Sequence, residues 1–68
     1  MSKHYRGHCI RLSRSQFWDA VIVEAESGVT LPTKATALLH EGESVAISRA
    51  HELIDLYVEA ASLETRAA

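Results

Sequence analysis

Cysteine, proline and glycine are all scarce in this sequence. A single cysteine, Cys9, excludes a disulfide within the chain, and the three isolated glycines exclude a glycine-rich phosphate-binding loop. No stretch reaches the roughly 20 apolar residues of a membrane span, and the first residues lead into no apolar run typical of a signal peptide. With one unpaired cysteine, these absences predict a cytoplasmic protein.

The length limits the chain to one unit. At 68 residues, 47% apolar and 24% charged, it has the composition of a folded globular domain. We expect a single domain over residues 1–68, with residues 1–4 and 65–68 flexible. A domain of about 60 residues buries only about 60% of its unfolded surface. Such scaffolds are often stabilised by a metal ion or by a second copy of the chain.

Charge is distributed unevenly, although the net charge is only −2. Lys3, Arg6, Arg11 and Arg14 are the only charged side chains of residues 1–16, so this segment is wholly basic. Every acidic residue lies at Asp19 or beyond it. The sequence therefore predicts a molecule with a basic end and an acidic flank.

Two segments in the first half of the chain have the composition of strands. Residues 5–13 read as a first strand in which Gly7 marks a bulge. Residues 17–25 are rich in aromatic and β-branched side chains and read as a second strand. Trp18 and Ile22 share one face of this strand, and Phe17 and Val21 share the other. Residues 26–28 follow as a tight turn.

The second half predicts a broken strand and then a helix. Residues 29–39 read as a third strand that Pro32 places at an edge or interrupts; the alternative is a loop followed by a short helix over residues 35–40. Residues 41–44 (Glu-Gly-Glu-Ser) mark the start of a helix with acidic residues in its first turn. Its expected apolar face consists of Ala46, Ile47, Ala50, Leu53, Ile54, Tyr57, Val58 and Ala61. The predicted fold is α+β: a three-stranded antiparallel sheet (β-β-β-α) packed against one long C-terminal helix.

Catalytic and metal-binding patterns are missing from the sequence. We expect no enzyme activity, no cofactor and no metal site. On one strand His4 and His8 would stand about 13 Å apart, too far to share an ion, and His51 would pair weakly with Asp55 in solvent. Cys9 is expected to be a small buried side chain; the alternative is a reactive thiol.

The predicted function is therefore non-catalytic binding to another protein or to a second copy of the chain. Glu52, Asp55 and Glu59 form an acidic stripe on the helix, which is a candidate docking face for a basic protein. A line of apolar side chains on the helix flank is a candidate dimer seam: Val45, Leu56 and Leu63.

The alternative function is nucleic-acid binding by the basic strands. Arg6, Arg11 and Arg14 would contact phosphates, and an exposed Trp18 would stack on bases. Trp18 is also a candidate core residue, because Ala20 and Ile22 share its face. The negative net charge weighs against this alternative.

The order of elements resembles a bacterial family. Residues 43–46 (Glu-Ser-Val-Ala) and 50–54 (Ala-His-Glu-Leu-Ile), after strands that contain Tyr5 and Trp18, resemble the sheet-and-helix core of HicB-type antitoxins over residues 5–57. The resemblance implies a small domain that binds and blocks a basic RNA-cleaving toxin, often as an oligomer. The acid-and-proline loop of that family is replaced here by residues 25–28, and no functional residue carries over.

Overall fold

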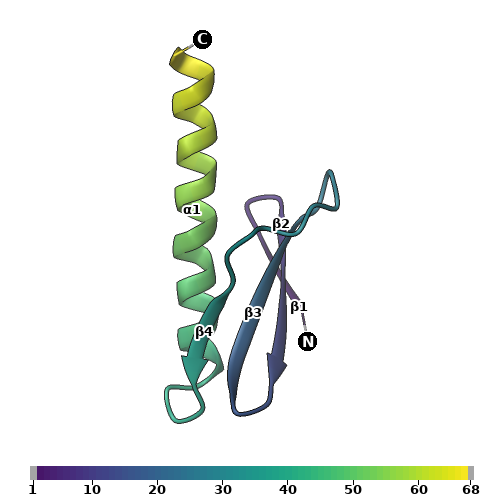
Figure 1. Cartoon of the computed structure of the whole chain (residues 1–68), viewed down its shortest axis with the longest axis vertical. Coiled ribbons are helices and arrows are strands. Elements are labelled where there is room, and N and C mark those ends of the chain that lie inside the picture. The colour runs from purple at the N-terminus through teal and green to yellow at the C-terminus, as the bar shows by residue number, and fades with distance from the viewer. Residues whose placement is uncertain (1, 68) are drawn as a thin grey trace.

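The computed structural model describes the backbone of residues 2–67 and the side chains of residues 3–61. Four strands precede one helix (Figure 1): β1 (Ser2–Tyr5), β2 (His8–Arg14), β3 (Phe17–Glu24), β4 (Ala35–Leu38) and α1 (Glu43–Ala67). The strands form one sheet in the order β1-β2-β3-β4, with every neighbouring pair antiparallel. The predicted α+β class is confirmed, whereas the prediction of three strands is wrong by one.

A tight turn at Arg6 and Gly7 creates the additional strand. Both residues have positive φ angles, 48° and 76°, as in the two-residue type I′ turn whose twist matches the strands it joins. Tyr5 therefore pairs with His8, and the chain reverses inside the segment predicted as one continuous strand over residues 5–13. Gly7 is a turn residue and not a bulge. Residues 2–4, expected at a flexible end, lie in β1.

The strand predicted over residues 17–25 is confirmed as β3, but its partner is shorter than predicted. Of residues 29–39, only Ala35–Leu38 forms a strand beside β3. The connection before it touches the sheet through a bridge between Val23 and Thr30 and a 2.9 Å hydrogen bond from the Leu31 N–H to the Ile22 carbonyl. Pro32 lies in this connection, so it interrupts the strand. The alternative of a short helix over residues 35–40 is wrong.

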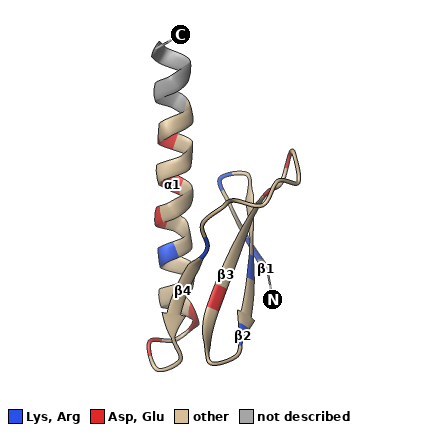
Figure 2. Cartoon of the chain, viewed as in Figure 1, with Lys and Arg blue, Asp and Glu red and all other residues tan. Residues whose placement is uncertain are grey.

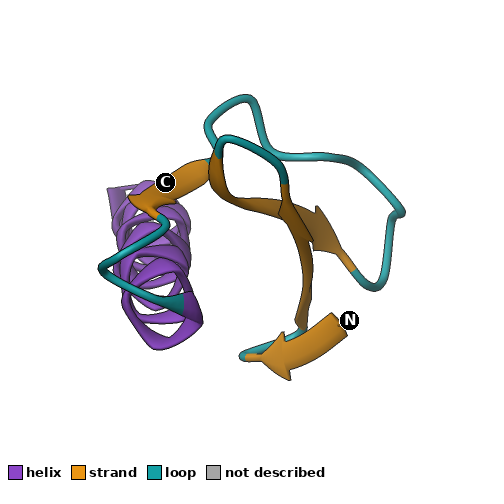
Figure 3. Ribbon diagram, turned by 90° about the horizontal axis from the view of Figure 1, so that it is seen from below, coloured by secondary structure: helices purple, strands orange, loops and turns teal. Residues whose placement is uncertain are grey.

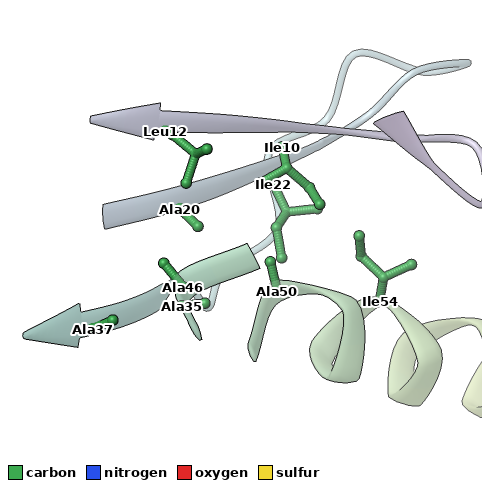
Figure 4. Close-up of a cluster of buried hydrophobic side chains, with 9 residues drawn as sticks. All are labelled: Ile10, Leu12, Ala20, Ile22, Ala35, Ala37, Ala46, Ala50 and Ile54. Atoms are coloured by element: carbon green, nitrogen blue, oxygen red, sulfur yellow. The ribbon is translucent and has the colours of Figure 1, made fainter. Parts of the chain in front are cut away.

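The core lies between the sheet and α1, which packs against one face of the sheet (Figure 3). Nine buried apolar side chains form it: Ile10, Leu12, Ala20, Ile22, Ala35, Ala37, Ala46, Ala50 and Ile54. Figure 4 shows Ile10 and Ile22 of the sheet pointing toward Ile54 of α1. Alanine makes up five of the nine residues, so the helix and sheet approach closely. The face of β3 that carries Ala20 and Ile22 is therefore the covered one.

The predicted apolar face of the helix is confirmed in its first four turns. Ala46, Ala50 and Ile54 are fully buried, and Ile47, Leu53 and Val58 pack against the core from its margin. Leu63 of the predicted dimer seam has a side chain outside the described residues. The same holds for residues 65–68, which the sequence predicts to be flexible.

Candidate functional site

The uncovered face of the sheet carries exposed apolar side chains. Among residues 2–67, no helix or strand lies over the face opposite α1 (Figure 3). Phe17 of β3 and Leu38 of β4 are cross-strand partners on this face, 37% and 55% exposed. Val21 and Val23 continue the same face along β3 and are half-buried. Residues that alternate along a strand share one face, so these four side chains form an apolar stripe on β3 and its edge neighbour.

Polar groups interrupt and border this apolar stripe. Asp19 lies between Phe17 and Val21 on β3, and its Oδ1 atom is 3.1 Å from the ammonium of Lys34. Thr36 is the cross-strand partner of Asp19, and the exposed Arg11 is the partner of Val21. An exposed apolar surface with a polar border is typical of protein-interaction sites.

The β4 edge of the sheet is closed by side chains of the same chain. The guanidinium of Arg49 donates to the Thr36 carbonyl at 2.9 Å, and the Leu38 N–H donates to the Glu41 carboxylate at 2.9 Å. Arg49 and Glu41 also form a two-bond ion pair, with distances of 3.1 and 2.9 Å. Because these groups occupy the outward backbone positions of β4, another strand cannot add there without displacing them.

The predicted acidic stripe is only partly available. The Asp55 carboxylate accepts from the Arg6 guanidinium at 2.7 Å and from the Tyr5 hydroxyl at 2.9 Å, so it joins the β1–β2 turn to α1. His51 does not pair with Asp55 as predicted but stacks on the Tyr5 ring, with centroids 3.9 Å apart. Glu52 and Glu59 remain exposed on the helix. Docking at the stripe stays a prediction, which now depends on these two glutamates.

Two carboxylates are held in their charged form by these contacts. The hydrogen bonds from Arg6 and then from Tyr5 lower the pKa of Asp55, and the same bond raises the pKa of the Tyr5 hydroxyl. The Leu38 N–H and then the Arg49 guanidinium lower the pKa of Glu41. A carboxylate with a lowered pKa stabilises the fold fully above its unfolded pKa and loses this effect as the pH falls through its folded pKa.

We expect acid to destabilise the wild type more than an Asp55→Asn variant. Between pH 7 and a pH below the lowered pKa of Asp55, the wild type protonates this carboxylate and loses its charge-assisted bonds to Arg6 and Tyr5, whereas the variant has no such carboxylate to titrate. Thermal unfolding followed by circular dichroism at both pH values measures the difference. An Asp55→Asn variant that loses as much stability on acidification as the wild type would contradict this coupling.

The residues predicted to bind nucleic acid are not brought together. Arg14 lies over the Trp18 ring, 5.8 Å from its centroid, on the side of the sheet that faces α1. Arg11 is on the opposite face, and Arg6 is bound to Asp55 at the other end of β2. Trp18 is half-buried and packs against the core, so the sheet presents no continuous basic and aromatic surface built from these four residues.

The histidines and the cysteine are also dispersed. The turn at residues 6 and 7 puts His4 and His8 on opposite faces of neighbouring strands, so their predicted 13 Å separation along one strand is wrong. His8 is buried with Nδ1 at 2.9 Å from the Arg6 carbonyl. Cys9 is half-buried on the uncovered face. Within the described residues, no three side chains of His, Cys, Asp or Glu are grouped as metal ligands would be.

A small cavity lies between α1 and the sheet. Its volume is about 110 Å³, and its lining residues are His8, Glu24, Leu31, Tyr57, Val58 and Ala61. Sites for drug-sized ligands are roughly 300–1,000 Å³, so this cavity has room for a side chain or a few waters.

Among the described residues, no helix has the length and apolar character needed to cross a membrane.

Comparisons with protein-family models, with curated proteins and with solved structures find no match. The candidate site is therefore inferred from the sequence and structure of this chain alone. Sequence reasoning missed the pairing of Phe17 with Leu38, because the period of a strand gives the face of each residue but not its partner on the neighbouring strand. The available signal was the alternation of β3: because one face of this strand is buried, the apolar side chains on its other face are left uncovered.

Proposed function

We propose that this domain is a non-catalytic protein-binding module whose uncovered sheet face contacts a partner protein. The exposed pair of Phe17 and Leu38 on that face is the observation that supports the proposal. The surface is the uncovered face of a sheet and not a concave pocket, which suits another protein better than a small molecule. The antitoxin-like role implied by the resemblance is one form that such binding could take.

The expected partner is a folded protein with an apolar patch of its own. Fully burying a large apolar side chain contributes about 1.5–3 kcal/mol. Because Phe17 and Leu38 are 37% and 55% exposed, a partner that covers both would gain about one such contribution from the pair. The charged groups at the border, Arg11 and the ion pair of Lys34 with Asp19, would set the orientation of the partner. Hydrophobic anchors surrounded by polar groups are the usual arrangement of interaction hot spots.

The double substitution Phe17→Ser with Leu38→Ser is expected to weaken partner binding by about 10- to 100-fold, because the exposed apolar area of both side chains is lost from the interface. The partner would be captured from a lysate of the source organism with the tagged chain, identified, purified and titrated by calorimetry. Far-ultraviolet circular dichroism would confirm that the variant is folded, which its exposed positions favour.

Two control variants separate this surface from the helix. Leu56→Ser removes a side chain that is 63% exposed on α1, and Glu52→Gln with Glu59→Gln neutralises the exposed part of the acidic stripe. Both are expected to retain binding. Loss of binding in a helix variant, with retention in the sheet variant, would move the site to α1. Capture of nucleic acid alone, released by salt, would overturn the proposal of a protein partner.

A further inference from the structure

The two edges of the sheet are not equivalent. Side chains of Arg49 and Glu41 occupy the β4 edge, whereas β1 ends the sheet on the other side. We propose that the free edge of β1 binds an extended acidic segment of a partner protein by β-strand addition. This inference goes beyond the proposed function, because it concerns the backbone edge of the sheet and not its uncovered face.

The turn at Arg6 and Gly7 determines which backbone groups of β1 point outward. The residues that flank a two-residue turn form a hydrogen-bonded pair, and the bonded and non-bonded pairs alternate along an antiparallel ladder. Tyr5 with His8 and Lys3 with Ile10 are therefore bonded pairs, and the N–H and C=O groups of His4 face away from β2. The 2.9 Å bond from the Ala25 N–H to the Gly7 carbonyl agrees with this alternation on the other side of β2.

These outward groups are available for another strand. Within the described part of the chain, no turn, loop or side-chain hydrogen bond reaches the backbone of His4. Strand addition to such an edge forms main-chain hydrogen bonds, and the side chains beside it decide which partner is accepted. The contrast with β4, where both Thr36 and Leu38 are engaged by side chains, makes β1 the edge that can accept a strand.

Charge favours an acidic occupant over a second copy of the chain. Figure 2 shows basic residues on β1 and β2 and acidic residues along α1. Lys3 lies on the side of the sheet that faces α1, and His4 lies on the uncovered face beside the exposed Arg11 of β2. A second β1 strand would bring Lys3 near its own copy, and like charges across a strand pair are destabilising. An acidic strand would instead face cations on both sides.

The test uses two capped octapeptides in which valine alternates with glutamate or with lysine. Titration into the isotope-labelled full chain, followed by amide chemical shifts, should show saturable binding of the glutamate peptide with the largest shifts in β1. The lysine peptide should bind at least tenfold more weakly. Binding of neither peptide would overturn the proposal, and equal binding of both would overturn the preference for acidic segments.

His4→Pro separates strand addition from attraction of charge alone. Proline is tolerated at an edge position whose N–H faces solvent, so the variant should fold and lose at least tenfold in affinity for the glutamate peptide. The matched His4→Ala variant keeps the backbone N–H and should bind within threefold of wild type. Unchanged binding by His4→Pro would contradict strand addition.

Sedimentation of the same proteins distinguishes the alternative occupant. The wild type and His4→Pro are expected to have the same association state. A wild-type dimer that becomes monomeric in His4→Pro would show that a second copy occupies the edge and would overturn the acidic-segment proposal. The double variant Phe17→Ser with Leu38→Ser should bind the glutamate peptide as the wild type does. A failure of the sheet-face proposal is therefore distinguished from a failure of the β1-edge proposal.

Discussion

Replacing Ile22 with alanine is expected to destabilise the fold by about 2–5 kcal/mol, the range for removing a fully buried branched side chain from a core. Ile22 has no exposed surface, pairs across the strands with Ile10 and faces Ile54 of the helix. A domain of this size has a total stability of only about 3–10 kcal/mol. The urea midpoint should therefore fall far below that of the wild type, because the expected loss is a large fraction of the total stability.

Val21→Ala is the matched control for this prediction. Val21 is the neighbour of Ile22 in β3, but it points to the uncovered face and is half-buried. Its replacement should change the free energy of unfolding by about 1 kcal/mol or less, since surface changes are usually small. Comparable losses in the two variants would contradict the placement of the core on the helix side. Unlike Ile22→Ala, the Phe17→Ser and Leu38→Ser variant should lose its partner while staying folded.

Ala50→Leu is expected to be the second large effect, with a loss of about 1–3 kcal/mol or more from overpacking. Ala50 has no exposed surface and lies where α1 meets the sheet (Figure 4). A leucine there has no free volume unless the helix moves away from the sheet, and such movement would open contacts at Ala46 and Ile54. Thermal and urea unfolding of the purified variant would measure the loss.

Ala60→Leu serves as its control on the same helix. Ala60 is exposed, and leucine is nearly as good a helix former as alanine, so its stability should stay within about 0.5 kcal/mol of wild type. If Ala50→Leu were neutral while Ala60→Leu was destabilising, the helix would pack on the sheet through a different face from the one described.

Elements with strong periodicity could be predicted from the sequence. The alternation in β3 and the apolar face of α1 are long enough to predict both elements and the buried side of the helix, at residues such as Ile54. The face of β3 that the helix covers could not be predicted, because both faces of that strand carry large apolar side chains. The β1–β2 turn could not be predicted, because Arg6 occupies a position where Asn or Asp is the usual signal. Pro32 correctly indicated an interruption, but the sequence does not show where the chain rejoins the sheet.

The candidate site depended on contacts between distant parts of the chain. Asp55 looks like a solvent-exposed helix residue in the sequence, and only the fold brings it to Tyr5 and Arg6 at the opposite end of the chain. The closing of the β4 edge by Arg49 and Glu41 likewise requires the helix to be docked. A helical or strand period gives the face of a residue, but it does not give the partner on another element.

The strand order of the sheet also has a consequence for how the chain reaches this structure. Each strand pairs with its neighbour in the sequence, so the sheet can grow by closing one short loop after another, and each closure loses little entropy. Proteins rich in such local pairings fold faster than those with distant pairings. The contacts between α1 and the sheet are not local, and the bonds from Asp55 to Tyr5 and Arg6 join residues 50 and 49 positions apart. We infer that the hairpins form early and that the contacts between α1 and the basic β1–β2 hairpin form in a late step.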